Sequence, residues 1–438
     1  MVAALVRVIL YLLVVTFPVW LTAFLGEPGG IITDVGRNFA LTGFMILVLQ
    51  FLIAARVKWI EKAFGLDILL RFHKYIAVSA LCLLLIHPLL LAQGVYGWEL
   101  IYSLNQPWPI WAGRIALIML IGIVLISIYQ VKISLSFEKW RFGHNISAPA
   151  ILILGFIHSW YIGVDLELVQ VQIIWVVALI LAIIVFVYHR IIRPKLLKRK
   201  AYTVKEVIPE TGDVWTVKMT PPEGRKIEEY MPGQFHFLTF FRDPTLPVEE
   251  HHWTISSSPA QKDFISSTIK AIGDFTSTIG QTRPGDTVAV HGSFGRFSHM
   301  FHPEDKDLVF LVGGIGITPV MAMLRYMRDT RDNRSVLLMY ANRSEDQIVF
   351  RDELDEMAKG KHPDLTLVHV LSRPDEKWEG EKGHMDREKI EKYCGRDLQE
   401  KTFYICGPLK MSEKLIAVLL DMGIPKKRMR REIFSFID

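Results

Sequence analysis

The apolar residues of this chain are unevenly distributed along the sequence. Long apolar runs with few charges fill residues 1–190, whereas residues 198–438 have the composition of an ordinary water-soluble protein. A bilayer core of roughly 30 Å is crossed by about 20 predominantly apolar helical residues, so runs of this length predict membrane-spanning helices. Six runs qualify: residues 3–25, 39–55, 69–92, 112–131, 146–164 and 168–189.

Basic residues between the runs predict the orientation in the membrane. Lys and Arg are concentrated after the second, fourth and sixth runs, whereas the opposite side carries only Arg37 and Arg114. Cytoplasmic connections carry the excess of basic residues. We therefore expect a multi-pass protein of the plasma membrane, embedded in the lipid bilayer, with both termini and the water-soluble half in the cytosol.

Charge and cysteine content exclude several classes of protein. The net charge of +5 is modest, and the basic residues lie beside apolar runs, so no nucleic acid partner is expected. The cysteines, Cys82, Cys394 and Cys406, are scattered and form no CxxC motif. Such a pattern predicts neither a disulfide framework nor a zinc site, and it favours a reducing compartment for the soluble half.

Two pairs of histidines within the spans predict a metal cofactor. His73 and His87 are 14 residues apart in the third run, and His144 and His158 repeat this spacing in the fifth. Fourteen residues are close to four helical turns, so both members of a pair share one face. Ionisable residues within a span are costly and usually functional. Ordinary packed histidines would explain one such residue but hardly two matched pairs.

Matching the histidines by depth gives one pair at each side of the membrane. His73 and His144 would hold an inner b-type haem, and His87 and His158 an outer one, through axial imidazole nitrogens. Both irons would then be held by protein ligands on both faces.

The water-soluble half divides into two parts by its periodicity. Residues 201–303 alternate β-type runs with Gly and Pro turns, which predicts a small antiparallel barrel. Residues 304–438 combine an apolar strand (307–312), a glycine-rich turn and a helix with further strands, which is typical of a parallel α/β domain. The resulting organisation is an all-α membrane domain (1–192), a basic linker (193–200), the barrel (201–303) and the α/β domain (304–438).

Several motifs stand in an order that is highly specific in combination: the doubled histidine spacing, HHWTISSSP (251–259), KAIGDFT (270–276), GGIGITP (313–319) and CGP (406–408). With these motifs the chain resembles the NADPH oxidase and ferric reductase family, in its compact prokaryotic form. The second half is similar to ferredoxin–NADP reductases. The resemblance implies an electron path from NADPH through FAD and the two haems.

The resemblance also implies roles for individual residues. The acceptor and donor chemistry at the flavin would involve Thr254, Cys406 and Phe436, the last as an aromatic shield displaced by nicotinamide. A second terminal aromatic, Phe434, belongs to the same pattern, whereas His252 stands where the family usually has proline. The cofactor-binding residues would be His251, Trp253, Thr254, Ser256 and Ser257 for FAD, Lys270, Gly273 and Thr276 for its pyrophosphate, Gly314, Gly316, Thr318 and Pro319 for the nicotinamide nucleotide, and Cys406, Gly407 and Phe436 at the nicotinamide.

The nucleotide preference depends on two arginines after successive strands. Arg343 and Arg373 occupy positions that contact the 2′-phosphate in similar enzymes, and guanidinium suits phosphate geometry. The pattern favours NADPH, with NADH possible.

The acceptor is the least constrained part of the prediction. Irons held on both faces give up electrons only at the haem edge, and the aromatic loop 92–113 either covers the outer haem or forms an interfacial belt. We expect O2 as acceptor and superoxide outside, with a ferric chelate as the alternative. A proton channel with a dehydrogenase sensor is a further alternative, and no obligatory protein partner is expected.

Overall fold

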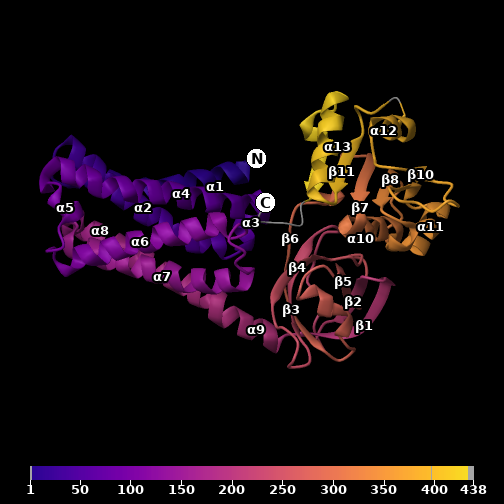
Figure 1. Cartoon of the computed structure of the whole chain (residues 1–438), viewed down its shortest axis with the longest axis horizontal. Helices are drawn as coiled ribbons and strands as arrows, with labels where there is room; N and C mark the ends of the chain where they lie inside the picture. The colour runs from indigo at the N-terminus through magenta and orange to yellow at the C-terminus, as the bar shows by residue number, and fades with distance from the viewer. Residues whose placement is uncertain (1, 396, 433–438) are drawn as a thin grey trace. The chain divides into compact units, whose positions relative to one another are not determined.

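The computed structural model describes residues 2–395 and 397–432. The chain divides into two compact units, Met1–Arg193 and Pro194–Asp438. The first unit is helical, and the second contains two six-stranded sheets (Figure 1).

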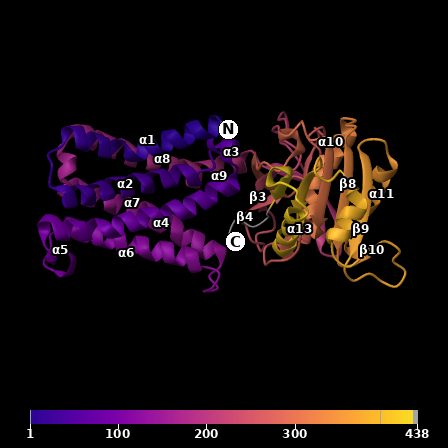
Figure 2. The ribbon, with the colours of Figure 1, turned by 90° about the horizontal axis from the view of Figure 1, so that it is seen from above.

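The first unit is a bundle of six helices that are long and apolar enough to cross a membrane. Figure 2 shows them running alongside one another, with the short helix α3 (Lys58–Phe64) at one end and α5 (Glu99–Tyr102) at the other. This confirms the predicted six-span domain. The long helices are α1 (Val2–Leu25), α2 (Ile31–Ala54), α4 (Leu66–Leu91), α6 (Trp108–Tyr129), α7 (Phe137–Ile162) and α8 (Val169–Val187).

Two of these helices continue as π-helical turns, which often mark functional sites. The turn Ala92–Tyr96 follows α4, and the turn Tyr188–Ile192 follows α8 and leads into α9 (Arg193–Arg199).

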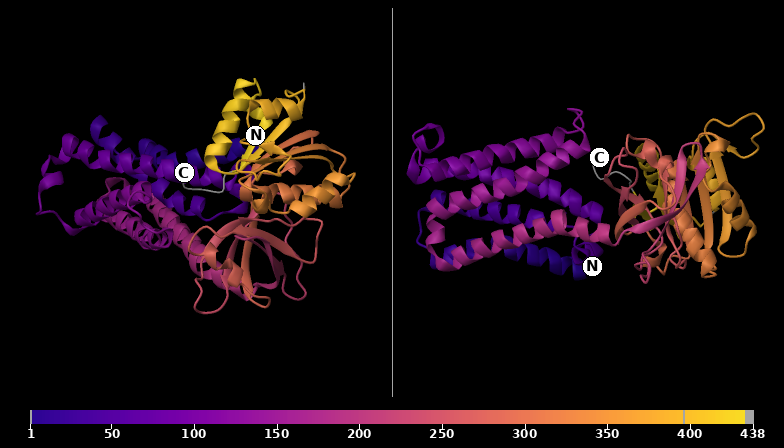
Figure 3. Two further views of the ribbon diagram at one scale, coloured as in Figure 1. Left: turned by 45° about the vertical axis from the view of Figure 1, so that its right-hand side comes forward. Right: turned by 90° about the horizontal axis from the view of Figure 1, so that it is seen from below.

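The first sheet of the second unit is antiparallel, as predicted, with the strand order β4-β3-β6-β1-β2-β5. An isolated bridge from Ile255, just after β4, to Ser267 of β5 joins the two ends of this order and closes the barrel. Figure 3 shows its curved strands. The strands are β1 (Tyr202–Thr211), β2 (Val214–Thr220), β3 (Phe235–Phe241), β4 (Glu250–Thr254), β5 (Ile265–Lys270) and β6 (Thr287–Phe294).

The second sheet is parallel, with the order β10-β9-β8-β7-β11-β12, and confirms the predicted α/β domain. Its strands are β7 (Asp307–Gly313), β8 (Ser335–Asn342), β9 (Asp364–Leu371), β10 (Glu381–Lys382), β11 (Thr402–Cys406) and β12 (Met429–Glu432). Its helices are α10 (Ile317–Asp329), α11 (Arg351–Lys359), α12 (Arg387–Cys394) and α13 (Leu409–Asp421).

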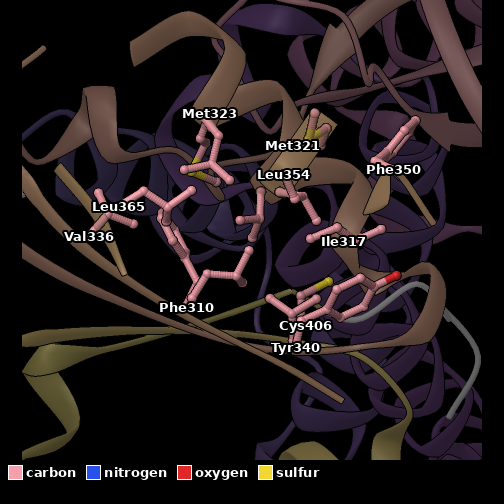
Figure 4. Close-up of a cluster of buried hydrophobic side chains, with 14 of the residues drawn as sticks. Phe310, Ile317, Met321, Met323, Val336, Tyr340, Phe350, Leu354, Leu365 and Cys406 are labelled. Atoms are coloured by element: carbon pink, nitrogen blue, oxygen red, sulfur yellow. The ribbon is translucent and has the colours of Figure 1, made fainter. Parts of the chain in front are cut away.

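Successive residues of a strand point to opposite faces, so each central strand contributes side chains to the hydrophobic cores on both faces of the sheet. Phe310 and Val312 of β7 pack with α10 and α11, in the cluster that Figure 4 shows. Val309 and Leu311 pack on the other face with α12 and α13. The sheet is therefore covered on both sides, and its strand ends are left to form a site.

Candidate functional site

The histidines of α4 and α7 meet in two pairs, as their spacing predicts. The ring centroids of His73 and His144 are 6.2 Å apart, and those of His87 and His158 are 6.5 Å apart. Metal–imidazole bonds of about 2 Å, plus a ring radius of about 1.1 Å on each side, give about 6 Å for one metal ion between two rings. The two separations fit iron with histidine on both faces.

The outer pair is oriented by backbone carbonyls of neighbouring helices. His87 Nδ1 lies 3.0 Å from the carbonyl oxygen of Gly36 on α2, and His158 Nδ1 lies 2.9 Å from that of Pro109 on α6. A carbonyl can only accept, so each Nδ1 carries a proton and each Nε2 keeps its lone pair. This is the usual arrangement of a metal-binding histidine.

The inner pair has a different environment. Gln50 of α2 donates to the carbonyl oxygen of His73 over 3.2 Å, which anchors the backbone of α4 at that point. His73 Nδ1 is buried and has no hydrogen-bond partner among the described residues. The Trp140 ring, one turn before His144, lies 5.3 Å from its imidazole.

A cavity of about 930 Å³ opens beside the outer pair. This volume is within the range of about 300–1,000 Å³ for cofactor and ligand sites. Its walls are mainly aliphatic and also contain aromatic and charged residues. Besides His87 and His158, they include Arg37, Tyr96, Trp111, Arg114 and Asp165.

Protein groups engage both arginines of this cavity. Arg37 pairs with Asp34 at 3.0 Å and with Asp165 at 3.5 Å. Arg114 donates to the carbonyl oxygens of Ser103 and Leu100, both over 2.8 Å. Each guanidinium could therefore bind a haem carboxylate only through N–H groups that these bonds do not already use.

The predicted FAD segment begins on β4 and continues into the turn after it. His251 Nε2 lies 2.7 Å from Glu249, and the His251 ring lies 4.6 Å from Phe275. Trp253 stacks on Phe275 at 5.9 Å. Thr254 is the next residue of the strand, so it points to the opposite face from Trp253.

Hydroxyl groups continue from this segment across the barrel strands. Ser256 Oγ is 3.0 Å from Ser266 Oγ and accepts a hydrogen bond from Thr268 over 2.9 Å. Ser257 Oγ accepts from the backbone nitrogen of Ser266 and lies 2.9 Å from Tyr230 Oη. The segment is therefore held rigidly from the barrel side.

The predicted pyrophosphate residues form a turn after β5. Thr276 Oγ1 accepts from the backbone nitrogens of Ile272 and Gly273, over 3.0 and 2.8 Å. Lys270, at the end of β5, pairs with Asp213 at 3.3 Å, and among the described residues it has no bond to the turn. The ring contact between His251 and Phe275 brings this turn beside β4.

The nucleotide loop lies where β7 and β11 end side by side. A Cβ on Gly316 would lie 2.5 Å from the carbonyl oxygen of Cys406, so the two loops pack too closely for any side chain there. Gly314 has φ +54°, and its carbonyl accepts from Tyr340 Oη over 3.1 Å. Thr318 donates to Ile315 over 3.1 Å. A helix N-terminus after a glycine turn suits phosphate.

The cysteine predicted to lie at the nicotinamide is buried in the structure. Cys406 is fully buried and belongs to the hydrophobic cluster that Figure 4 shows, and burial raises the pKa of its thiol well above the ordinary value. The side chain is therefore a neutral packing group and not a thiolate nucleophile.

Arg343 and Arg373 become neighbours at the ends of β8 and β9. The backbone nitrogen of Arg373 donates to the carbonyl oxygen of Arg343 over 2.7 Å. Both side chains are exposed, and within residues 2–395 and 397–432 neither forms an ion pair. Phe434 and Phe436 lie outside the described residues.

Sequence reasoning missed the groups that orient the site. The carbonyls of Gly36 and Pro109 have no sequence signal, because any residue offers a carbonyl. Arg325, which bonds the carbonyl of Ser256, carries no motif either.

Two family models match the chain. One, described as the ferric reductase like transmembrane component, matches residues 39–155. The other, described as the oxidoreductase NAD-binding domain, matches residues 310–415.

Curated relatives match only in part. Cytochrome b5 reductase 4 of Homo sapiens is 30% identical over 213 residues, which are 48% of this chain and 38% of that protein. The plasma membrane-associated coenzyme Q6 reductase PGA3 of Saccharomyces cerevisiae is 29% identical over 179 residues, which are 40% of this chain and 56% of that protein. The chain thus covers less than two thirds of either relative.

Among solved structures, a flavohemoglobin from Malassezia yamatoensis with bound FAD and heme has a TM-score of 0.50 at 14% identity. The match covers 92% of this chain and 99% of that one, and it shows a likeness of fold alone.

Proposed function

We propose that this chain, a transmembrane NAD(P)H-dependent oxidoreductase of the ferric reductase and NADPH oxidase family, carries electrons from NADPH across the membrane to dioxygen and releases superoxide. The dehydrogenase half would lie in the cytosol and the outer histidine pair near the opposite face of a plasma membrane. The proposed domains are residues 1–192, 201–303 and 304–438, with 193–200 as a linker.

The observation that carries the proposal is the double histidine pair at two depths of one bundle. His73 with His144, and His87 with His158, each stand at a spacing suited to one iron. The Nδ1 protons of the outer pair are bound to backbone carbonyls. The two rings of the outer pair are therefore oriented before any metal binds, with Nε2 available as the ligand atom.

The residues of the second unit would bind and orient the nucleotides. Thr254, Ser256 and Ser257 lie on the rigid segment next to the closed barrel, where they would hold the flavin. The loop of Gly314 and Gly316 would receive the nucleotide phosphates on backbone N–H groups. FAD, when bound, accepts electrons in pairs and gives them up singly, and b-type haem carries them one at a time.

Haem content tests the proposal directly. In His158→Leu the outer iron would lose one ligand, so haem per chain should fall by half while flavin content stays unchanged. A reduced-minus-oxidised spectrum with dithionite measures both. His384→Leu, which changes an exposed histidine of the dehydrogenase half, should leave the haem content unaltered. Full haem content in His158→Leu would contradict the ligand assignment.

A further inference from the structure

One guanidinium joins three separate elements of the second unit. Arg325 lies on α10, and its Nη1 donates to the carbonyl oxygen of Ser256 over 2.7 Å. Its Nε and Nη2 donate to the two carboxylate oxygens of Glu353 on α11, over 3.0 and 2.6 Å. The barrel, the long helix of the nucleotide loop and the start of α11 therefore meet at this side chain.

The contact is built from strong, partly buried bonds. A two-pronged arginine–carboxylate pair fixes orientation as well as charge. The side chains are 16% exposed for Arg325 and 28% for Glu353, so water screens the pair only in part. The guanidinium also lies 4.7 Å from the centre of the Phe350 ring, and Phe350 itself holds a left-handed backbone, with φ +61°, to begin α11.

Ser256 is a rigid point of attachment. It is fully buried, its backbone nitrogen donates to the carbonyl oxygen of Ser266 over 2.8 Å, and its hydroxyl belongs to the barrel network. It lies two residues beyond Thr254, which we place at the flavin. Any shift of the Ser256 carbonyl would therefore move Thr254 with it.

The other end of α10 lies at the nucleotide loop. The helix begins at Ile317, directly after Gly316, and Arg325 follows eight residues later, or about 12 Å along the axis. Val320, Met321 and Leu324 are fully buried against the sheet, so the helix has no freedom to slide. The buried helix α10 thus connects the nucleotide loop, through Arg325, to the carbonyl of Ser256.

We propose that Arg325 is a positioning residue, which sets the distance between the flavin segment and the nucleotide loop by clamping the carbonyl of Ser256 to α10 and Glu353. This inference rests on the proposed function, since it concerns the transfer from nicotinamide to flavin. Arg325 is not among the residues that we place at the flavin or at the nicotinamide nucleotide, and its bonds are to Ser256 and Glu353. Its loss should loosen residues 254–257 and misalign the transfer without weakening nicotinamide binding.

The variant Arg325→Gln tests the clamp in the full-length protein. Hydrogen exchange, measured before FAD is added, should become faster at the amides of Ser256 and Ser257. Single-turnover reduction of the flavin by NADPH should slow by about tenfold, the equivalent of one charge-assisted hydrogen bond. The KM for NADPH should stay within about twofold, as for a change outside the binding site. Arg325→Lys, which keeps the charge and can still reach one partner, should recover part of the rate.

Arg328 provides a matched control on the same helix. Its Nη1 also contacts Glu353, at 3.2 Å, but the structure gives it no bond to Ser256. Arg328→Gln should leave both exchange and rate within about twofold of the wild type.

Equal effects of Arg325→Gln and Arg328→Gln, or unchanged exchange at Ser256 with an unchanged rate, would overturn the clamp alone. A wild-type protein that neither binds FAD nor oxidises NADPH in these assays would overturn the proposed function and the clamp together.

Discussion

The charge of two exposed arginines should decide which nucleotide is preferred. Arg343 and Arg373 are joined through their backbones and leave two guanidinium groups at the ends of β8 and β9. In a variant that carries both Arg343→Ala and Arg373→Ala, the loss of each contact to the 2′-phosphate should weaken NADPH binding by about 1.5–3 kcal/mol. The KM should therefore rise steeply for NADPH and little for NADH. Equal increases for the two nucleotides, measured under the same conditions, would show that neither arginine binds the phosphate.

A buried histidine of the barrel should make the second unit sensitive to acid. His236 is completely buried with Nε2 2.7 Å from Ser267 Oγ, and burial lowers its pKa from 6.5 to about 3. The unfolded chain binds a proton below pH 6.5, whereas the folded chain stays neutral. The contribution of His236 to stability is therefore complete above pH 6.5 and falls by about 1.4 kcal/mol per pH unit below it.

Hydrogen exchange at the amides of β3 and β4, followed between pH 7 and pH 5, would measure this effect after correction for intrinsic exchange rates. His236→Gln, which keeps a hydrogen-bonding group, should flatten the dependence. His384→Gln, at an exposed site, should not. The same slope in His236→Gln as in the wild type would assign the acid sensitivity to other groups.

At the scale of elements, the packing of α6 against α7 should depend on a single glycine. A Cβ on Gly113 of α6 would lie 2.4 Å from Nδ1 of His158, the atom bonded to the Pro109 carbonyl. Gly113→Ala must therefore displace the imidazole, at an overpacking cost of about 1–3 kcal/mol. We expect the outer haem to be lost and the haem absorbance per chain to fall by about half.

Gly122 is the matched control on the same helix, because nothing lies within 4 Å of a Cβ built there. Gly122→Ala should bind haem like the wild type. Normal haem content in Gly113→Ala would mean that α6 and α7 can separate without disturbing the ligand.

The helices of the first unit were predictable because the thickness of the bilayer sets the length of the apolar run that crosses it. The residues at which these helices begin were less predictable. The second and fifth helices begin at Ile31 and Phe137, whereas the apolar runs suggest residues 39 and 146. The difference lies in first turns that carry charge, such as Asp34 and Glu138, because a helix can extend beyond the hydrocarbon while hydropathy measures only the part inside it.

The strands likewise differed in how clearly an apolar pattern marked them. Those with strong apolar patterns were predictable, whereas β12 (Met429–Glu432), which pairs with β11, has Met429 as its only apolar residue. In the candidate site, the 14-residue spacing predicted the histidine pairs. The carbonyls that orient His87 and His158 lie 51 and 49 residues away in sequence and depend on helix packing, which no local pattern encodes.

For the whole molecule, the proposed acceptor can be tested at the point where electrons would leave the protein. With histidine on both faces, a haem iron would have no free position for O2, so electrons would leave singly at the haem edge and form superoxide instead of peroxide. With NADPH, FAD and haem, the purified protein should reduce cytochrome c in air, and superoxide dismutase should suppress most of that reduction.

In sealed vesicles with the dehydrogenase outside, transfer should also be electrogenic, since each electron crossing gains or costs about 2.3 kcal/mol per 100 mV. An uncoupler that collapses the potential should then speed the reaction. Reduction that is insensitive to dismutase, with a ferric chelate consumed faster than oxygen, would make the protein a ferric-chelate reductase that uses the same histidine pairs.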